Sequence, residues 1–288
     1  MTSISERGAS ALSIQHHYDV SDEFYSLWLD ESMTYSCGLW GDDDDCLATA
    51  QKRKIDYLVC LSGAAGRERV LDIGCGWGSV MQRLVTEHRV EHVTGLTLSA
   101  TQARRIGEQG DPRMEVRICD WADFVADAPY DAAISVGAME HFVKFGWERK
   151  QKVAAYRRFF EKCHESLKPG AGMALQTIGK GNVVLDEQGL KDTLFIAQHI
   201  FPESDPPRLA EMMHAAEKLF EVKSVVNHRE HYARTCSAWL QRLRANRTEA
   251  AMITSPEKVE AYETYLEASI RQFRLGHANL YRISLCRV

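Results

Sequence analysis

The sequence has no surplus of basic residues. Its 288 residues include 35 Lys and Arg against 40 Asp and Glu, which gives a formal net charge of −5. Domains that bind nucleic acid usually carry a basic patch or stripe to meet the phosphates. The charge balance therefore argues against nucleic acid as a partner.

CxxC pairs and long apolar runs are also missing. The eight cysteines occur at positions 37, 46, 60, 75, 119, 163, 236 and 286, a scatter typical of reduced thiols rather than of disulfides or a zinc site. The acidic run Asp42–Asp45 is interpreted as a solvated loop, so we predict no metal site. The N-terminus has no apolar stretch of signal-peptide length, and no run approaches the length of a membrane span. These absences predict a cytoplasmic protein without a transmembrane segment.

What is present, from residue 68 onward, is an alternation of short apolar runs with helical patterns. Residues 78–87, 99–108 and 148–167 have helical patterns, and LKPGAGM at 167–173 marks a helix stop and a turn. The strand candidates are Arg69–Gly74, His92–Leu98, Met114–Cys119, Tyr130–Val136, Met173–Ile178, Phe220–Val226 and a terminal strand near Leu280–Val288. This alternation predicts an α/β fold with a mostly parallel seven-stranded sheet and helices on both faces.

Two segments fall outside that alternation. Residues 1–65 are expected to form an N-terminal helical cap that carries an aromatic-rich stretch. Residues 179–219 contain LFIAQHIFP, a Pro-Pro break and an amphipathic helix, and are expected to form an inserted lid over the substrate. We therefore predict one domain, with a nucleotide-binding core at 66–178 and the rest of the core, including two helices, at 220–288.

The strongest local signal is VLDIGCGWG at residues 70–78. A buried strand runs into Gly74, Gly76 and Gly78 and then into a helix. Glycines permit a tight turn and let the backbone approach a ligand closely, and the helix N-terminus favours an anionic group. The spacing is GxGxG, whereas the dinucleotide fingerprint is GxGxxG. The pattern predicts that Asp72 and the three glycines bind a nucleoside cofactor other than a dinucleotide.

Polar side chains follow the next two strands. Thr97, Ser99 and Gln102 come after the second strand, and Asp120 and Trp121 after the third. Ligands of open α/β sheets bind at the carboxyl ends of the strands. Thr97, Ser99 and Gln102 can bond a ribose, Asp120 can accept from an adenine amino group, and Trp121 can lie against the ring. Any one of these residues would be ordinary for a polar loop, but together they favour a nucleoside-binding site.

Six motifs along the chain resemble the cyclopropane fatty-acid synthase family, and in size most closely the mycolic acid cyclopropane synthases. They are HYDVSDEFYSLWLDESMTYSC, VLDIGCGWG, VTGLTLSATQ, SVGAMEHF, HYARTCSAWL and FRLGHANLYRISLC. The resemblance implies a Rossmann-like class I methyltransferase fold and methyl transfer from S-adenosylmethionine (SAM) to an electron-rich carbon. The positions that match family contacts to SAM are Tyr35, Ser36, Gly74, Gly76, Thr97, Leu98, Gln102 and Trp121, and we add Val136.

The resemblance also implies a bicarbonate that acts as the base in ring formation. The matching holders are Cys37, the backbone near Val136, Glu140, Tyr232 and a histidine whose position here is Gln176. Glutamine can bond an anion but carries no positive charge. From this departure we predict that bicarbonate binds weakly and that the product keeps an intact methyl group.

The residues themselves fit such chemistry. Methyl transfer from a sulfonium to an alkene leaves a carbocation, which aromatic faces and a carboxylate can stabilise. Glu140 is the candidate carboxylate, and Tyr18, Tyr35 and Tyr232 are candidates for the aromatic wall. Plain alternatives stay open: Glu140 as a helix-start acid, Cys37 as a small buried side chain, Tyr232 as a core aromatic.

Two functions compete. One is a methylase of long unsaturated acyl chains, cyclopropane synthase-like, with an acyl carrier protein as a candidate partner. The other is a C- or N-methyltransferase of specialised metabolism acting on a compact polyketide, terpenoid or alkaloid, a reading that Gln176 favours. A non-catalytic cyclase on the same fold is a third hypothesis, and the glycine spacing argues against a nicotinamide oxidoreductase.

Overall fold

The computed structural model describes residues 21–41 and 45–288. Their seven strands form one sheet in the order β3-β2-β1-β4-β5-β7-β6. All neighbouring pairs from β3 to β5 are parallel, and only β7 runs antiparallel to its two neighbours. The strands are β1 Arg69–Ile73, β2 His92–Thr97, β3 Met114–Ile118, β4 Tyr130–Val136, β5 Leu167–Lys180, β6 Phe220–Asn227 and β7 Ala278–Arg287. The predicted α/β fold and mostly parallel seven-stranded sheet are confirmed.

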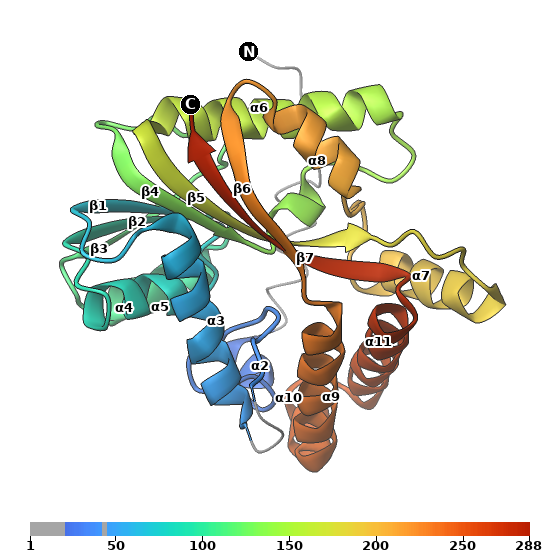
Figure 1. Cartoon of the computed structure of the whole chain (residues 1–288). Helices are drawn as coiled ribbons and strands as arrows, with labels where there is room; N and C mark the ends of the chain where they lie inside the picture. The colour runs from blue at the N-terminus through green and yellow to red at the C-terminus, as the bar shows by residue number, and fades with distance from the viewer. Residues whose placement is uncertain (1–20, 42–44) are drawn as a thin grey trace.

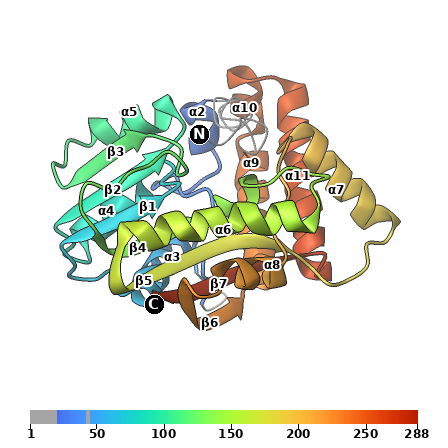
Figure 2. The same cartoon turned by 90° about the horizontal axis from the view of Figure 1, so that it is seen from above.

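Helices cover both faces of this sheet (Figure 1). The helices are α2 Asp22–Ser26, α3 Leu47–Ser62, α4 Ser79–Thr86, α5 Ala100–Glu108, α6 Arg149–Ser166, α7 Glu187–His199, α8 Leu209–Ala216, α9 Arg229–Ala245, α10 Arg247–Ile253 and α11 Pro256–Leu275. Helices α6 and α8 lie on one face, and Figure 2 shows α6 crossing over β4 and β5. Helices α3, α4 and α5 lie on the other.

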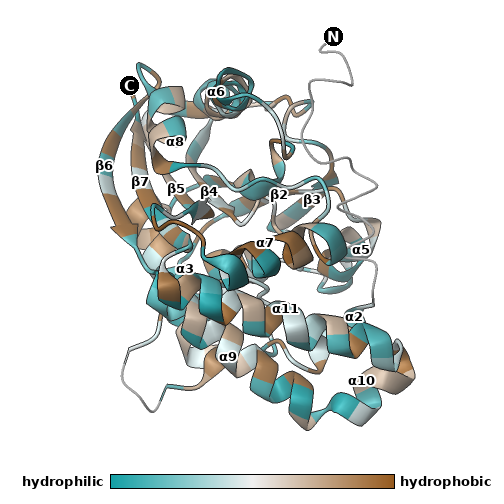
Figure 3. Cartoon of the chain, turned by 90° about the vertical axis from the view of Figure 1, so that its right-hand side faces the viewer, coloured by the Kyte–Doolittle hydropathy of each residue, from teal (hydrophilic) through white to brown (hydrophobic). Residues whose placement is uncertain are grey.

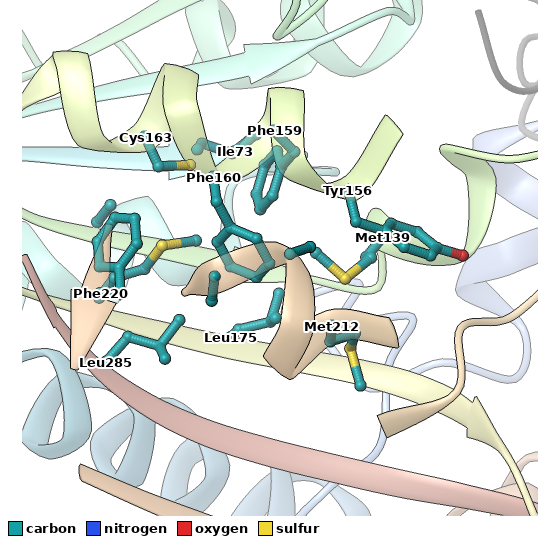
Figure 4. Close-up of a cluster of buried hydrophobic side chains, with 14 of the residues drawn as sticks. Ile73, Met139, Tyr156, Phe159, Phe160, Cys163, Leu175, Met212, Phe220 and Leu285 are labelled. Atoms are coloured by element: carbon teal, nitrogen blue, oxygen red, sulfur yellow. The ribbon is translucent and has the colours of Figure 1, made fainter. Parts of the chain in front are cut away.

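Successive residues of each central strand belong to hydrophobic clusters on opposite faces of the sheet, because side chains alternate between the two faces. In β5, Leu175 joins the cluster under α6 and α8, while Ala174 joins the cluster under α3, α4 and α5. Figure 4 shows Phe159 and Phe160 of α6 pointing toward Leu175. Burial on both faces explains why these strands read as continuous apolar runs in the sequence.

A third core lies outside the sheet, among α2, α9, α10 and α11. It is rich in aromatic side chains, including Tyr25, Trp28, Trp239 and Tyr262. Edge-to-face contacts join them, as between Trp28 and Trp239, whose ring centroids are 5.7 Å apart. This part of the chain holds three helices where the sequence predicted two. The break between α9 and α10 falls at Asn246, whose amide donates to the carbonyl oxygens of Leu27 and Arg242.

Two further segments differ in detail from expectation. The segment 167–173 was predicted to be a turn before a strand, but β5 already begins at Leu167, directly after α6. The pairing with β4 shifts from Leu167 to Gly172 while β4 advances from Tyr130 to Ala132, so the Pro-Gly residues form an irregularity within the strand. Helix α3, from the predicted cap, packs against β5 and β7. The division into cap, core and lid stays a prediction.

Within the described ranges, no helix has the length and apolar character needed to cross a membrane. The same residues contain no group of three His, Cys, Asp or Glu side chains placed to hold a metal ion. Of the predicted acidic loop, Asp45 is described, and its carboxylate forms an ion pair with Arg53. Tyr18 and positions 42–44 lie outside the described residues.

Candidate active site

A cavity of about 440 Å³ opens at the carboxyl ends of β1, β2, β3 and β4. Strand β1 pairs with β2 on one side and with β4 on the other, so the chain reverses its direction of winding across the sheet at this point. Loops diverge at such a reversal and leave a crevice, the usual ligand position in open α/β sheets. The cavity therefore lies where the sequence predicts the cofactor.

The three glycines after β1 have different surroundings, although all have positive φ. A Cβ on Gly74 would meet Ala138 at 2.9 Å, and one on Gly78 would meet Ile106 at 2.8 Å. A Cβ on Gly76 would meet no atom of the described residues within 4 Å. Gly74 and Gly76 line the cavity, and Gly78 does not. The absence of a Cβ at Gly78 thus lets the turn before α4 pack closely on Ile106 of α5, and its contact with the cofactor stays a prediction.

The predicted ribose-binding residues form one hydrogen-bonded group on the cavity wall. The Thr97 hydroxyl donates to Gln102 Oε1 at 2.6 Å and accepts from the Ser99 amide at 3.1 Å. Ser99 caps α5 by accepting from the Gln102 amide at 3.3 Å. Because Gln102 Oε1 accepts from Thr97, its side-chain NH₂ is the group left to donate to a ligand.

Asp120 and Trp121 line the next part of the wall, after β3. One Asp120 oxygen accepts from the Ala122 amide at 2.9 Å, which fixes the carboxylate. The Trp121 ring packs against Phe142 and Phe159, with centroids 4.8 and 5.4 Å away. An immobilised carboxylate beside an aromatic face can bond and stack on an adenine ring.

The strand β1 itself contributes Asp72, which is 1% exposed and lines the cavity. Neither carboxylate oxygen has a hydrogen-bond partner among the described residues. Burial raises the pKa of Asp72 to about 7. A buried, unpartnered carboxylate costs free energy unless a ligand or a proton compensates it, so this wall is suited to a cationic group.

Tyr35 and Ser36, which the sequence predicts to contact the cofactor, also line the cavity. The Tyr35 ring lies 5.3 Å from Trp28 and 5.2 Å from Trp239, and its hydroxyl donates to Tyr265 at 3.1 Å. The Ser36 hydroxyl accepts from the ammonium of Lys54 at 2.9 Å. Lys54 belongs to none of the motifs that the sequence shows. Lys54 ends the basic run Lys52-Arg53-Lys54, a pattern typical of a solvated helix face, so nothing in the sequence indicates that its side chain turns inward.

The predicted catalytic side chains do not line this cavity but form a buried cluster adjoining it. Cys37 directly follows Ser36, and Glu140 lies between the wall residues Ala138 and His141. One Glu140 oxygen accepts from the Ile178 amide at 2.6 Å, and the other has no partner among the described residues. Burial raises the pKa of Glu140 to about 7.

Two neutral donors belong to the same cluster. Burial raises the pKa of the Cys37 thiol to about 11, and burial raises the pKa of Tyr232 above its usual value. Cys37 and Glu140 are also among the groups that shift the pKa of Tyr232, which places the three close together. The Tyr232 ring stacks on Phe273 at 4.4 Å. Near neutral pH both groups keep their protons.

Gln176 of β5 is paired across the sheet with Arg282 of β7. The Arg282 guanidinium donates from Nε to Gln176 Oε1 at 2.7 Å, and from Nη2 to the carbonyls of Cys37 and Gly38 at 2.9 and 3.0 Å. Arg282 is 0% exposed. No local sequence pattern predicts this contact, because the register of two strands more than 100 positions apart decides which side chains meet.

Three polar atoms of this cluster have no hydrogen-bond partner among the residues that the structure describes: Gln176 Nε2, Arg282 Nη1 and Glu140 Oε2. Two are donors and one is an acceptor. The expectation of weak anion binding rested on the missing charge of a histidine at position 176. The structure supplies such a charge from Arg282, whose guanidinium stays protonated and contacts Gln176.

Comparison with known proteins places the chain in a family. The family model for mycolic acid cyclopropane synthetase matches residues 6–283. Cyclopropane mycolic acid synthase MmaA2 of Mycobacterium tuberculosis is 35% identical over 288 residues, which covers 95% of this chain and 96% of that protein. The solved structure of MmaA2 superposes with a TM-score of 0.89 at 32% identity, covering 97% of this chain and 99% of that one.

A second structure, of mycolic acid cyclopropane synthase CmaA1 in complex with SAH and CTAB, gives a TM-score of 0.88 at 32% identity. It covers 98% of this chain and 100% of that one. The cofactor of the chain is SAM, whose demethylated product is SAH. The chain therefore belongs to the mycolic acid cyclopropane synthetase family of SAM-dependent methyltransferases.

Proposed function

We propose that this enzyme transfers the SAM methyl group to a carbon–carbon double bond of a long, apolar acyl-type substrate and closes a cyclopropane ring. The observation that carries the proposal is the buried cluster of Glu140, Tyr232, Gln176 and Arg282 beside the donor cavity. Its members match what alkene methylation requires: stabilisation of a carbocation and removal of one proton.

The residues of the cavity would orient the donor. SAM supplies an electrophilic methyl group on a positively charged sulfur. The Thr97–Gln102 pair and Asp120 are suited to the ribose and adenine, which leaves the far end of the cavity, near Tyr35 and Ser36, for the sulfur. Tyr35 there offers an aromatic face to a cation.

Glu140 would stabilise the positive charge that develops on the substrate. Its oxygen Oε1 accepts from the Ile178 amide, while its oxygen Oε2 is buried and without a partner among the described residues, so Oε2 is the atom left to interact with a cation. In a water-excluded site, a fixed charge of this kind stabilises a transition state more than the same charge does in water. Glu140 also has a pKa near neutrality, which keeps it partly ionised at pH 7.

The orphan donors of Gln176 and Arg282 fit a small oxyanion such as bicarbonate. Their Nε2 and Nη1 atoms would bond its oxygens, and Glu140 Oε2 would accept from its hydroxyl. Bound there, bicarbonate would supply the base for the proton lost on ring closure. Cys37 and Tyr232, which stay protonated, would add neutral donors around it.

The apolar nature of the substrate is supported by the segment that follows β5. Figure 3 shows apolar stretches on α7. The exposed side chains there and just before it are Val183, Val184, Leu185, Leu190 and Leu194. Exposed apolar groups clustered in one segment mark a surface for an apolar partner.

The proposal also includes an acyl chain bound to a carrier protein, and a cytoplasmic location, which suits the eight free thiols. A compact polyketide, terpenoid or alkaloid is not favoured, because the matched relatives are named cyclopropane mycolic acid synthases.

Product analysis with a trideuterated methyl donor tests the proposal. The purified enzyme is incubated with unsaturated acyl chains, free and carrier-bound, and the products are analysed by mass spectrometry. Ring closure removes one proton from the transferred methyl group, so a cyclopropane product retains two deuterons. A product with three deuterons would show methylation without ring closure and would overturn this part of the proposal.

A further inference from the structure

We infer that Lys54 and Asp72 together recognise the amino-acid end of SAM, Lys54 through its α-carboxylate and Asp72 through its α-ammonium. This assigns Lys54 a binding role that no motif of the sequence indicates. The inference rests on the donor cavity and on the use of SAM, and not on the identity of the methyl acceptor.

The burial of Lys54 requires an explanation. Its side chain comes from the inner face of α3, is 0% exposed and lines the cavity. A lysine ammonium has three donors, and among the described residues only Ser36 Oγ accepts from it. Burial lowers the pKa of Lys54 to about 7, and the Asp30 carboxylate, which counters this only in part, accepts from the amides of Ser32 and Thr34. A buried ammonium without a carboxylate partner is costly, so a ligand that supplies one would be bound strongly.

A structural role alone would not need a lysine here. One turn earlier on α3, Gln51 already ties the same segment down by donating to the carbonyl oxygens of Ser36 and Thr34, at 2.7 and 3.3 Å. The bond from Lys54 to Ser36 adds a charge to a segment that a neutral amide already holds.

Asp72 completes the pair. Each of the two groups shifts the pKa of the other, so they lie close, yet no ion pair joins them within the described chain. Both line the cavity. Because Lys54 and Asp72 lie near each other without forming an ion pair, a ligand that carries both a carboxylate and an ammonium group can bind between them. The methionine part of SAM carries a carboxylate and an ammonium on one carbon, which matches this arrangement.

The test uses ligand affinity and needs no methyl acceptor. Isothermal titration calorimetry is run with SAH and with two analogues of SAH, one lacking the carboxylate and one lacking the amino group. A charge-assisted hydrogen bond changes affinity on the order of 10- to 100-fold. Lys54→Met should weaken SAH binding by that factor and leave the decarboxylated analogue within about twofold of wild type. Asp72→Asn should weaken SAH binding by the same factor and leave the affinity for the deaminated analogue within about twofold of wild type. Lys52→Met, at an exposed position of the same helix, is the matched control and should change nothing.

Equal loss of both ligands in a folded Lys54→Met protein would overturn the inference, because it would indicate general damage to the cavity. Unchanged SAH affinity would do so as well. Lys54→Gln replaces the methionine variant if the latter fails to fold. The wild-type protein gives an independent check, since equal affinity for SAH and its decarboxylated analogue would exclude recognition of the carboxylate. Ring formation is measured separately, so failure here leaves the proposed reaction untouched.

Discussion

Arg282 and Gln176 are bound to each other across two antiparallel strands, with Arg282 Nε 2.7 Å from Gln176 Oε1 and both side chains buried. The bond fixes the orientation of the amide, because Gln176 Oε1 accepts from the guanidinium and its NH₂ must point elsewhere. A neutral glutamine and a charged arginine thus act as one group of donors. The charge missing at position 176 is present one strand away.

Arg282→Met should therefore change the product rather than the binding of SAM. Without the guanidinium, Gln176 can reorient and the site loses its charge, so we expect ring closure to fall relative to simple methylation. The ratio of products with two and three deuterons measures this. Arg104→Met, at a surface arginine of α5, is the control. An unchanged product ratio in a folded Arg282→Met enzyme would count against a role for this pair in proton removal.

Glu140→Gln should lower kcat on the order of 10²- to 10³-fold, because it removes a buried charge from the transition state. SAH affinity should stay near that of wild type, since Glu140 does not line the donor cavity. The variant keeps an oxygen to accept from the Ile178 amide, so its fold should survive. Near-normal turnover would reduce Glu140 to a structural acid.

The pH dependence of turnover should also depend on Glu140. Its pKa is about 7, so the stabilising carboxylate is lost as pH falls through that value. We expect wild-type kcat to rise with pH from about 6 to 8 and the Glu140→Gln enzyme to lack this rise. The comparison of the two pH profiles is the measurement. A rise of the same size in both would assign it to another group.

Gly76→Val should abolish binding of SAM and SAH while leaving the protein folded. A Cβ at Gly76 meets no atom within 4 Å in the part of the chain that the structure describes, so the side chain extends into the cavity that the ligand needs. The positive φ of 54° adds strain of about 1 to 2 kcal/mol. Gly78→Val is the contrasting variant: its Cβ would clash with Ile106 inside the core, so it should chiefly lower the free energy of unfolding. Calorimetry and urea unfolding separate the two effects.

The contribution of Asp72 to the stability of the ligand-free protein should fall as pH rises from about 4 to 7. The folded-state pKa of Asp72 is raised from 3.8 to about 7, so in this range the folded state holds a proton that the unfolded state has released. The contribution is fully present below pH 3.8 and is lost through pH 7, amounting to up to about 4 kcal/mol. Glu140 acts in the same direction, whereas His141 and His228, whose pKa values burial lowers to about 4, act in the opposite direction.

Urea unfolding at pH 5 and pH 8 checks this expectation. Asp72→Asn should remove part of the loss, so its stability relative to wild type should increase between the two pH values. Asp127→Asn is the control, because the exposed Asp127 pairs with Arg69 and its pKa is lowered, not raised. If Asp72→Asn and wild type showed the same loss, Asp72 would not carry the raised pKa.

Much of the architecture follows from the sequence alone. Apolar runs separated by helical patterns determine a parallel sheet, since a run buried on both faces has only that place in an α/β fold. The glycine spacing and the polar residues after successive strands locate the cofactor end of the sheet, because parallel strands all end at one edge. These signals are local: each depends on residues a few positions apart.

Only the tertiary structure decided which side chains complete the site. Gly76 opens onto the cavity and Gly78 onto Ile106, although both belong to one motif. Lys54 turns inward from a helix more than 15 positions before Asp72, and Arg282 reaches Gln176 because of the register between β5 and β7. Strand register and helix packing are settled by the burial of whole faces and not by the residue itself. Charged residues such as Lys54 and Arg282, whose contacts depend on this packing, are therefore not recognisable from the sequence around them.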